Sequence, residues 1–293
     1  MARQRKLAYL ALLAAAAIWG IAPPLIKYTL NFISPTTFLF YRFLIASVIL
    51  LPLLIYRLAI SRLRFTSPYL LVGLIGTPLN LFLLFEGLKK TSASEASVLS
   101  VLSPLFIVAG GLIFLREKLA KNEKIGLLVA SAGISLTLFQ SNLNQPHMLG
   151  NLLVLAGSLT WAIFTLAAKK LQLEPAALTA ASFLTGTFVV WPITTSFSLP
   201  AAAWPGIIFM ALAGSVIAYW AYSFGVKQIE ASEAGLFTYL QPLFGLPLAH
   251  FFLHETIQPL FLAGTLIIAL GVVINNFLFY NNSHESQNSP SMV

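Results

Sequence analysis

Residues 87–104 read GLKKTSASEASVLSVLSP, and residues 225–242 read GVKQIEASEAGLFTYLQP. The two stretches share a glycine, an Ala-Ser-Glu-Ala core and a proline in one unbroken register, in which position 87 matches 225 and position 104 matches 242. The match continues as far as Gly133 in the first stretch and Gly271 in the second. Self-similarity at a fixed offset is typical of internal duplication, so the chain is predicted to consist of two related halves.

Further matches extend both halves toward their starts. Trp19 and Lys27 match Trp161 and Lys169, with a slightly larger offset that a small loop insertion explains. Three segments are therefore predicted: a first half over residues 1–140, a second half over 148–279, and a polar tail over 280–293. The tail has few apolar side chains to bury and is expected to be disordered.

Composition places the chain in a membrane. Of its 293 residues, 58% are hydrophobic and only 9% are charged, and the mean hydropathy is +0.86. A soluble protein needs more charged residues on its surface. Apolar runs of about 20 residues recur along the chain, each long enough to cross a hydrocarbon layer roughly 30 Å thick. The predicted fold is an all-α membrane protein with ten transmembrane helices, near residues 7–27, 36–56, 68–88, 95–115, 123–140, 148–168, 178–196, 205–226, 234–253 and 259–279.

The topology follows from the number of helices and from the basic residues. Each half contains five helices, an odd number, so the second half enters the membrane from the opposite side and the repeats are inverted. One side of this topology holds Arg3, Arg5, Lys6, Arg57, Arg62, Arg64, Arg116, Lys118, Lys121, Lys124, Lys169, Lys170 and Lys227, whereas the other holds Lys27, Lys89 and Lys90. By the positive-inside rule, both termini are expected in the cytoplasm and the chain in the inner membrane of the cell.

The composition also excludes several kinds of site. There is no cysteine and no aspartate, so disulfides and thiolate metal sites are excluded and all nine acids are glutamates. We therefore expect neither a cofactor nor a metal. The G-x-x-x-x-G-K-S/T loop of nucleotide hydrolases does not occur. The expected partners are the lipid bilayer and a small-molecule substrate, with no nucleic acid, because the net charge of +8 is explained by membrane topology.

The order of glycine, Ser-Glu-Ala, proline, glutamate and two glycines in both halves, with Trp19-Gly20 and Tyr41-Arg42-Phe43 upstream, resembles the drug/metabolite transporter (DMT) superfamily, EamA type. The resemblance covers nearly the whole chain. It implies a ten-helix carrier, not an enzyme, that exports amino acids or related metabolites. The architecture predicts a secondary transporter working by alternating access between inverted repeats. Uniport, exchange and proton coupling all stay open, as do a monomer and a homodimer.

The matched prolines mark the expected centre of the molecule. Pro104 and Pro242 lie nine residues beyond the glutamates of the two Ser-Glu-Ala motifs, about 13 Å into the bilayer at 1.5 Å per residue. Proline removes a backbone donor, so both helices should kink and free the carbonyls of Ser100 and Thr238. Polar backbone at this depth is tolerated against a cavity or against packed protein. The pair therefore predicts either a cavity lining or a packing kink.

Aromatic residues cluster at the same predicted depth. Trp19 and Trp161 fall near the middle of their helices, whereas membrane tryptophans usually collect at the interface. Around a cavity they would provide flat walls for an apolar or aromatic solute, or attract an ammonium group by cation–π interaction. Tyr219 and Tyr222, on one face of their helix, and Asn80 would add polar contacts. The alternative is that these side chains pack the core.

Three ionisable residues within the predicted spans are candidates for binding or coupling. Arg42 could bind a carboxylate, form a structural ion pair or snorkel to the surface. Glu86 has Lys89 and Lys90 on the same helix face, which favours a surface salt bridge; if it faces the cavity, it is the best candidate for proton coupling. His250 could be a hydrogen-bonded core residue or a proton relay.

Other functional classes remain open at this point. A small-multidrug or cation exporter would be expected to hold a carboxylate at mid-membrane, and only the peripheral Glu86 is available. An intramembrane hydrolase could combine Ser215 or Ser158 with His250, although the G-x-S-x-G motif is absent. A non-transporting scaffold predicts that the central aromatic residues pack without a cavity.

Overall fold

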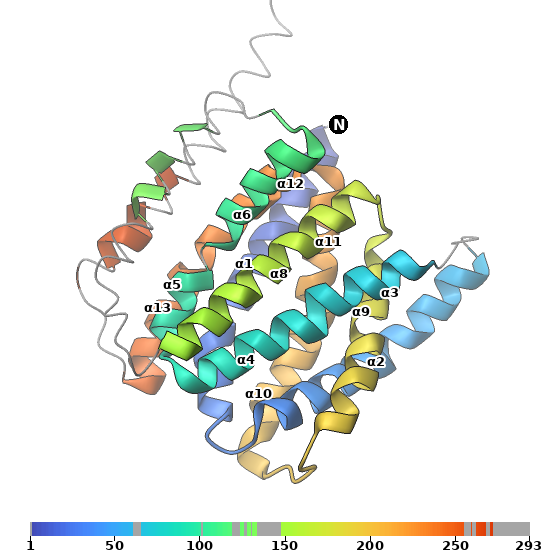
Figure 1. The fold of residues 1–293 in the computed structure, drawn as a ribbon, viewed down its shortest axis with the longest axis vertical. Helices are drawn as coiled ribbons and strands as arrows, with labels where there is room; N and C mark the ends of the chain where they lie inside the picture. Colours follow the sequence, from blue (N-terminus) through green and yellow to red (C-terminus); the bar gives the residue numbers. More distant parts are fainter. Residues whose placement is uncertain are drawn as a thin grey trace, which may run out of the picture.

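The computed structural model describes residues 2–60, 66–100, 102–118, 124–125, 128–129, 131–133, 148–254, 259, 262–267 and 270–271. All regular structure in these ranges is helical (Figure 1). The first two helices are α1 (Ala2–Thr29) and α2 (Pro35–Ile60). A third stretch joins α3 (Ser67–Leu74), the π-helical η1 (Ile75–Leu79) and α4 (Asn80–Lys90). A fourth comprises α5 (Ala93–Ser100), α6 (Ser103–Gly110) and the π-helical η2 (Gly111–Leu115).

The second half begins with α8 (Met148–Lys170) and α9 (Pro175–Val190), which ends in the short η4 (Trp191–Ile193). The next stretch joins η5 (Ala201–Ala203), α10 (Trp204–Phe209), the π-helical η6 (Met210–Ile217) and α11 (Ala218–Gln228). The last comprises α12 (Ala231–Leu236), the 3₁₀ turn η7 (Phe237–Leu240) and α13 (Gln241–Leu253). The bounds agree with the predicted helices to within a few residues.

Seven described stretches are long and apolar enough to cross a membrane: Arg3–Thr29, Pro35–Ala59, Ser67–Lys90, Met148–Lys170, Pro175–Ile193, Ala201–Gln228 and Ala231–Leu253. Large apolar side chains on their outer surface are exposed, for example Phe188 (69%) and Phe251 (72%), which suits lipid rather than water. The predicted helices over 123–140 and 259–279 lie mostly outside the described residues. The chain is thus built to cross a membrane several times, and the number ten stays a prediction.

The two helical stretches that carry the matched prolines, Pro104 and Pro242, are both interrupted shortly before the proline. In the first half, α5 ends at Ser100 and α6 begins at Ser103, with Pro104 in its first turn. In the second half, the 3₁₀ turn η7 ends at Leu240, and α13 begins with Pro242 in its first turn. Proline fits a first helical turn because the missing donor would have no intrahelical acceptor there.

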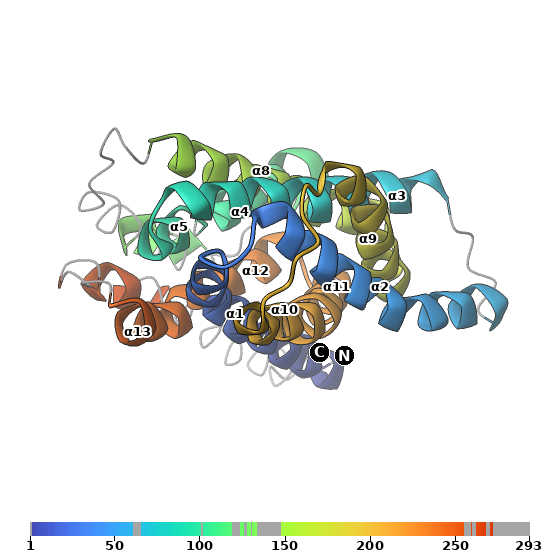
Figure 2. The same ribbon diagram turned by 90° about the horizontal axis from the view of Figure 1, so that it is seen from below.

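The helices pack in two layers around the central region. Seen from below, α4, α5 and α8 lie in one layer and α1, α10 and α13 in the other (Figure 2). Helix α1 packs against α11 and α13, while α8 packs against α4, α5 and α6, and α2 packs against α9. The helix that opens each half therefore packs against the third stretch of the other half, α1 against α11 and α8 against α4.

Two matched lysines define the ends of the bundle. Lys27 donates to the carbonyls of Leu88 (2.7 Å) and Thr91 (2.6 Å), and we call this the Lys27 end. Asn151, at the start of α8, accepts from Thr91 there at 2.7 Å.

The opposite end repeats the arrangement with the other half. Lys169 donates to the carbonyls of Val226 (3.1 Å) and Ile229 (2.6 Å), which match Leu88 and Thr91 in the repeat, and we call this the Lys169 end. Each lysine thus caps a helix C-terminus, where carbonyl groups lack intrahelical donors. The start of α1 also lies at this end, because Arg5 pairs with Glu233 of α12.

Candidate functional site

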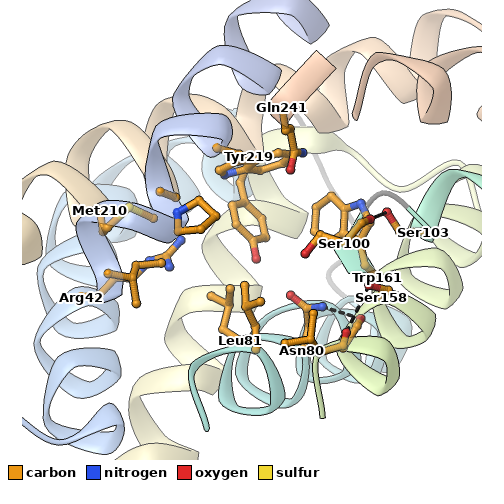
Figure 3. Close-up of a pocket in the computed structure, with 17 residues that line it drawn as sticks. Arg42, Asn80, Leu81, Ser100, Ser103, Ser158, Trp161, Met210, Tyr219 and Gln241 are labelled. Atoms are coloured by element: carbon orange, nitrogen blue, oxygen red, sulfur yellow. Dashed lines mark hydrogen bonds between the residues drawn. The ribbon is translucent and has the colours of Figure 1, made fainter. Parts of the chain in front are cut away.

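A cavity lies between the two helix layers and encloses about 700 Å³ of empty space, including its open mouth (Figure 3). Trp19, Trp161, Tyr219 and Gln241 line its deepest part. From there it extends toward the Lys27 end, where its lining includes Ile26, Leu84 and Val154.

An aromatic cluster lies at the base of the cavity: Trp19, Trp161 and Tyr219 line it, and Tyr222 packs against them. The ring centroid of Trp19 lies 5.1 Å from that of Trp161, 5.3 Å from Tyr219 and 5.4 Å from Tyr222. Trp161 lies 4.9 Å from Tyr222 and 5.5 Å from Tyr219. Most of these pairs are edge-to-face or tilted, the arrangements that aromatic rings prefer. The cluster separates the cavity from the Lys169 end.

Two π-helical segments supply the polar groups that hold this cluster. In a π-helix the regular i to i−4 bonding is displaced, and such segments often occur at functional sites. The Gly214 carbonyl in η6 accepts from the indole N–H of Trp19 at 3.0 Å. The Gly76 carbonyl in η1, which matches Gly214 in the repeat, accepts from the Tyr219 hydroxyl at 3.4 Å. The same position in each half therefore presents a carbonyl to an aromatic residue of the cluster.

Among the described residues, Arg42 is the one charged residue that lines the cavity. Its side chain is only 1% exposed, so it does not snorkel to the surface. Nε donates to Ser215 Oγ at 2.7 Å, and Nη2 makes a longer contact of 3.4 Å with the Gly214 carbonyl. Nη1 is buried and has no hydrogen-bond partner in the described part of the chain. The ion pairs found among the described residues are Arg5 with Glu233 and Lys90 with Glu86, so no described acid balances Arg42.

Neutral polar groups lie across the cavity from Arg42. Figure 3 shows Asn80, Ser100, Ser103 and Ser158 on that side, with Tyr219 between them and Arg42. Asn80 donates through Nδ2 to the Gly157 carbonyl at 2.7 Å, which fixes the amide plane. The cavity is therefore cationic on one side, aromatic at its base and neutral on the other side.

The lining contains six residues of the predicted cavity: Trp19, Arg42, Asn80, Ser100, Trp161 and Tyr219. Tyr222 and Thr238 are predicted there too but do not line it. Tyr222 lies in the aromatic cluster and hydrogen bonds with Thr165 at 3.1 Å, and Thr238 is buried and donates to the Gly235 carbonyl at 2.7 Å. Both lie toward the Lys169 end, whereas the described lining of the cavity extends toward the Lys27 end.

The two coupling candidates lie outside the cavity lining. Glu86 forms an ion pair with Lys90 at 3.9 Å, at the spacing expected for a surface pair on a helix. His250 is exposed on α13, with its ring 5.3 Å from that of Phe251. A role of either residue in proton coupling stays a prediction.

Four polar residues of the site are not among the predicted cavity residues: Ser103, Ser158, Ser215 and Gln241. Ser103 and Gln241 occupy the same position in the two halves, directly before the matched prolines, and both line the cavity. That position could have been recognised because a polar residue precedes a proline in an apolar span twice. The sequence suggests Ser215 only as a nucleophile, and its role as the Arg42 partner could not be recognised because 173 residues separate the two.

Polar contacts close the Lys169 end. Arg5 Nη2 lies 2.6 Å from Glu233 Oε1, and the Tyr9 hydroxyl donates to the same oxygen. The Glu117 carboxylate accepts from the backbone N–H groups of Ala231 (2.9 Å) and Ser232 (3.1 Å), at the start of α12. Carboxylates are favourable at helix N-termini. This end therefore differs from the open Lys27 end.

Glu230 lies beside these groups, between two membrane-spanning stretches. Burial, reinforced by the nearby carboxylates of Glu117 and Glu233, raises the pKa of Glu230 above the usual value for a glutamate. Among the described residues, no group of three or more His, Cys, Asp or Glu side chains is placed to hold a metal ion.

The profile of the EamA-like transporter family matches residues 6–139 and again residues 148–277. The chain belongs to this family. EamA-like relatives of similar length include the uncharacterized transporter YyaM of Bacillus subtilis (strain 168), 27% identical over 282 residues that cover 90% of this chain and 92% of the relative. The uncharacterized transporter YetK of the same organism is 29% identical over 284 residues, covering 91% and 86%. An uncharacterized transporter of Archaeoglobus fulgidus is 25% identical and covers 91% and 97%.

A solved crystal structure shares the fold. It superposes with a TM-score of 0.76 at 19% sequence identity, covering 92% of this chain and 96% of the other. Together with the apolar stretches, these comparisons identify the chain as a multi-pass membrane transporter of the EamA-like family. The resemblance predicted from the repeated motifs is confirmed.

Proposed function

We propose that the chain is a secondary transporter that moves a small organic solute, an amino acid or a related metabolite, across the inner membrane, in the export direction. In this proposal, ten helices form two inverted repeats, both termini are cytoplasmic, and the solute site opens alternately to the two sides. The Lys27 end then faces outward and the Lys169 end faces the cytoplasm.

The one-sided cavity carries this proposal. Matched residues near the aromatic cluster line it in pairs, as Trp19 and Trp161 or Ser103 and Gln241 do. In matched pairs that lie away from the cluster, only the residue nearer the Lys27 end lines the cavity. Ser100 does so, while Thr238, its match in the second half, is buried. Alternating access requires two related halves in unequal environments. If the halves exchanged their environments, the cavity would open to the other side of the membrane.

The size and chemistry of the cavity suit a small metabolite with an apolar part. Aromatic rings form its base, and hydrogen-bonding side chains lie on its walls (Figure 3). A few well-placed polar groups in an apolar cavity are typical of small-molecule sites. Proton coupling through Glu86 or His250, solute exchange, uniport, and a monomer or homodimer in the bilayer all remain compatible with this arrangement.

The competing functions have less support. A cation exporter needs an acid in its site, and none of the described lining residues is acidic. For a hydrolase, Ser215 Oγ is occupied by Arg42 and donates to the Met210 carbonyl at 2.9 Å. Ser158 Oγ donates to the Val154 carbonyl at 3.1 Å. Neither serine is paired with His250 in the described hydrogen bonds, so a nucleophile and base are not brought together.

Solute uptake into vesicles tests the proposal. Purified full-length protein is placed in lipid vesicles, and uptake of labelled phenylalanine, leucine, alanine and their N-acetyl derivatives is compared with that of empty vesicles. We expect saturable uptake of at least one solute and a loss of at least tenfold in Trp19→Ala, because Trp19 lines the cavity and touches three rings of its base.

Trp220→Ala is the matched control. Trp220 follows Tyr219 on the same helix, is 44% exposed and stacks on Phe224 away from the cavity, so its loss should leave uptake near the level of the unmodified protein. If Trp19→Ala does not fold, Asn80→Ala tests the opposite wall. Absence of uptake for every solute, or equal uptake by the two tryptophan variants, would contradict the proposal.

A further inference from the structure

We propose that Arg42 binds a carboxylate of the transported solute, so that the cavity selects organic acids with one net negative charge over amines and neutral molecules. This inference rests on the proposed transport function and narrows its substrate class. The solute would place its carboxylate at Arg42, its apolar body on the aromatic cluster and a neutral donor group at Asn80.

The first argument is an uncompensated charge. Arg42 is 1% exposed, and the described acids do not pair with it. A buried guanidinium without a counter-ion is costly, and the cost falls when an anion enters the site. Because Arg42 lines a cavity large enough for a small molecule, the anion can come from a solute.

The second argument is the orientation of the guanidinium. Nε is held by Ser215 Oγ at 2.7 Å, and this hydroxyl in turn donates to the Met210 carbonyl at 2.9 Å. Nη1 is left without a partner in the described part of the chain, and Nη2 has only the 3.4 Å contact with Gly214. The free edge of a fixed guanidinium matches the two oxygens of a carboxylate.

The third argument is the absence of an acid from the cavity lining. In the described part of the lining, Arg42 is the one charged residue, and Asn80, Ser100, Ser103, Ser158 and Gln241 are all neutral. An ammonium group in this cavity would meet only neutral oxygens and aromatic rings. The Asn80 side-chain oxygen can also accept from a neutral N–H or O–H group, which brings no second unpaired charge. A zwitterion should therefore bind less tightly than the corresponding acid with a blocked amine.

A set of four phenylalanine derivatives separates these contributions. Phenylalanine has both charges, N-acetylphenylalanine only the carboxylate, phenylalaninamide only the ammonium, and N-acetylphenylalaninamide neither. Binding of each to the purified full-length protein in detergent is measured by tryptophan fluorescence, since Trp19 and Trp161 line the cavity. We expect N-acetylphenylalanine to bind at least tenfold more tightly than N-acetylphenylalaninamide, and phenylalanine to bind more weakly than N-acetylphenylalanine.

Arg42→Gln should abolish the difference between acid and amide. It should leave the melting temperature of the solute-free protein unchanged or higher, because it removes an unpaired buried charge. A purely structural role of Arg42 predicts the reverse, a lower melting temperature with the acid preference retained. Arg57→Gln is the matched control, since it removes the same charge from the same helix outside the cavity lining. If Arg42→Gln does not fold, Ser215→Ala is used, with an expected loss of about threefold in acid preference.

The inference would be overturned by equal binding of acid and amide, by acid preference that survives in Arg42→Gln, or by failure of both carboxylates to bind. Tighter binding of phenylalaninamide than of N-acetylphenylalanine would overturn it as well. The transport proposal is judged separately, because vesicle uptake of any solute that depends on Trp19 supports the carrier even when Arg42 has no part in selecting it.

Discussion

The two Ser-Glu-Ala motifs have the same sequence but different surroundings. Glu233 is 4% exposed and is bound by Arg5 and Tyr9 from the start of α1. Glu95, its match in the first half, contacts the Thr91 hydroxyl within its own half. In the register that pairs Trp19 with Trp161, Tyr9 matches Asn151, which also contacts Thr91. At the Lys169 end an ion pair joins the two halves, Arg5 with Glu233, and the lining of the cavity extends toward the other end.

The comparison shows that the repeat explains the fold but does not by itself explain which end of the molecule is closed. The matched lysines cap matched helix ends in both halves, so this part of the structure follows the repeat. Tyr9 contacts Glu233, whereas Asn151, its match in the second half, contacts Thr91 instead. We infer that the unmatched contacts set which end is closed, and substitutions that remove them test this inference.

The largest effect is expected from Gly20→Ala, which disturbs the closest contact between α1 and α13. A Cβ built on Gly20 would overlap the Gln241 carbonyl oxygen, and one on Gly245 would lie 2.5 Å from the Gly20 carbonyl oxygen. The matched positions in the other half carry Ala162 and Ile107. Backbone displacement should cost about 1–3 kcal/mol, measured as a lower melting temperature in detergent.

The control for this substitution is Ala162→Gly, which makes the second half resemble the first. It introduces no clash and should cost roughly 0.5–1 kcal/mol through backbone entropy. A Gly20→Ala protein that melts at the temperature of the unmodified protein would show that the close approach of α1 and α13 is not required.

The next effect concerns the ion pair itself. Glu233→Gln removes a charge-assisted bond to Arg5, and because the Arg5 side chain is 41% exposed, solvent screening should limit the loss to about 1 kcal/mol. That energy corresponds to about a fivefold rise in opening of the Lys169 end. Since the chain has no cysteine, a single Thr238→Cys substitution reports opening as the rate of thiol modification.

Glu95→Gln is the matched substitution at the Lys27 end. Because that end is already open, the rate of thiol modification at Thr238→Cys should change by less than about twofold. A change of this size corresponds to the small energy of a surface contact. Equal rates in the two glutamine variants would show that the Arg5–Glu233 pair does not hold the Lys169 end closed.

The smallest effect is expected at Glu230, which occupies the position of Ser92 in the first half. Burial and the neighbouring carboxylates of Glu117 and Glu233 raise the pKa of Glu230. A carboxyl group with a raised pKa stabilises the folded state while it is protonated, and that contribution is lost as pH rises through the raised pKa. Glu230→Ser should therefore be more stable than the unmodified protein at neutral pH, by less than about 0.5 kcal/mol.

Melting temperatures measured from pH 4 to pH 7 check this expectation. The difference between Glu230→Ser and the unmodified protein should widen as pH rises through the titration of Glu230. Ser92→Ala, at the matched position of the open end, should show no such change with pH. A constant difference across the range would mean that the pKa of Glu230 is the same in the folded and unfolded states.

Much of this architecture could be predicted from the sequence. Apolar length and the spacing of charges and prolines predict the helix bounds, because a membrane requires a continuous helix of about 20 residues. Six cavity residues, including Trp19 and Arg42, could be named because polar and indole groups are unusual at mid-membrane. The matched prolines also mark the interruptions of both helices.

Other features could not be predicted because they depend on contacts distant in the chain or on conformational state. The π-helical segments have no local signature in the second half, where η6 contains no proline, unlike η1 with Pro78. The sequence predicts that Tyr222 and Thr238 line the cavity because a repeat treats both halves alike, and neither is in the lining of this conformation. The structure has one open end, and these two residues lie on the closed side.

Thiol modification at the matched pair Ser100 and Thr238 tests alternating access most directly. Both residues lie one helical turn before the matched prolines, and both accept a small change to cysteine. Without solute, Ser100→Cys should react rapidly with a membrane-impermeant reagent and Thr238→Cys slowly, since only Ser100 lines the cavity. A transported solute should lower the first rate and raise the second. If solute binds and is transported while both rates stay unchanged, the two ends do not open alternately and the account is wrong.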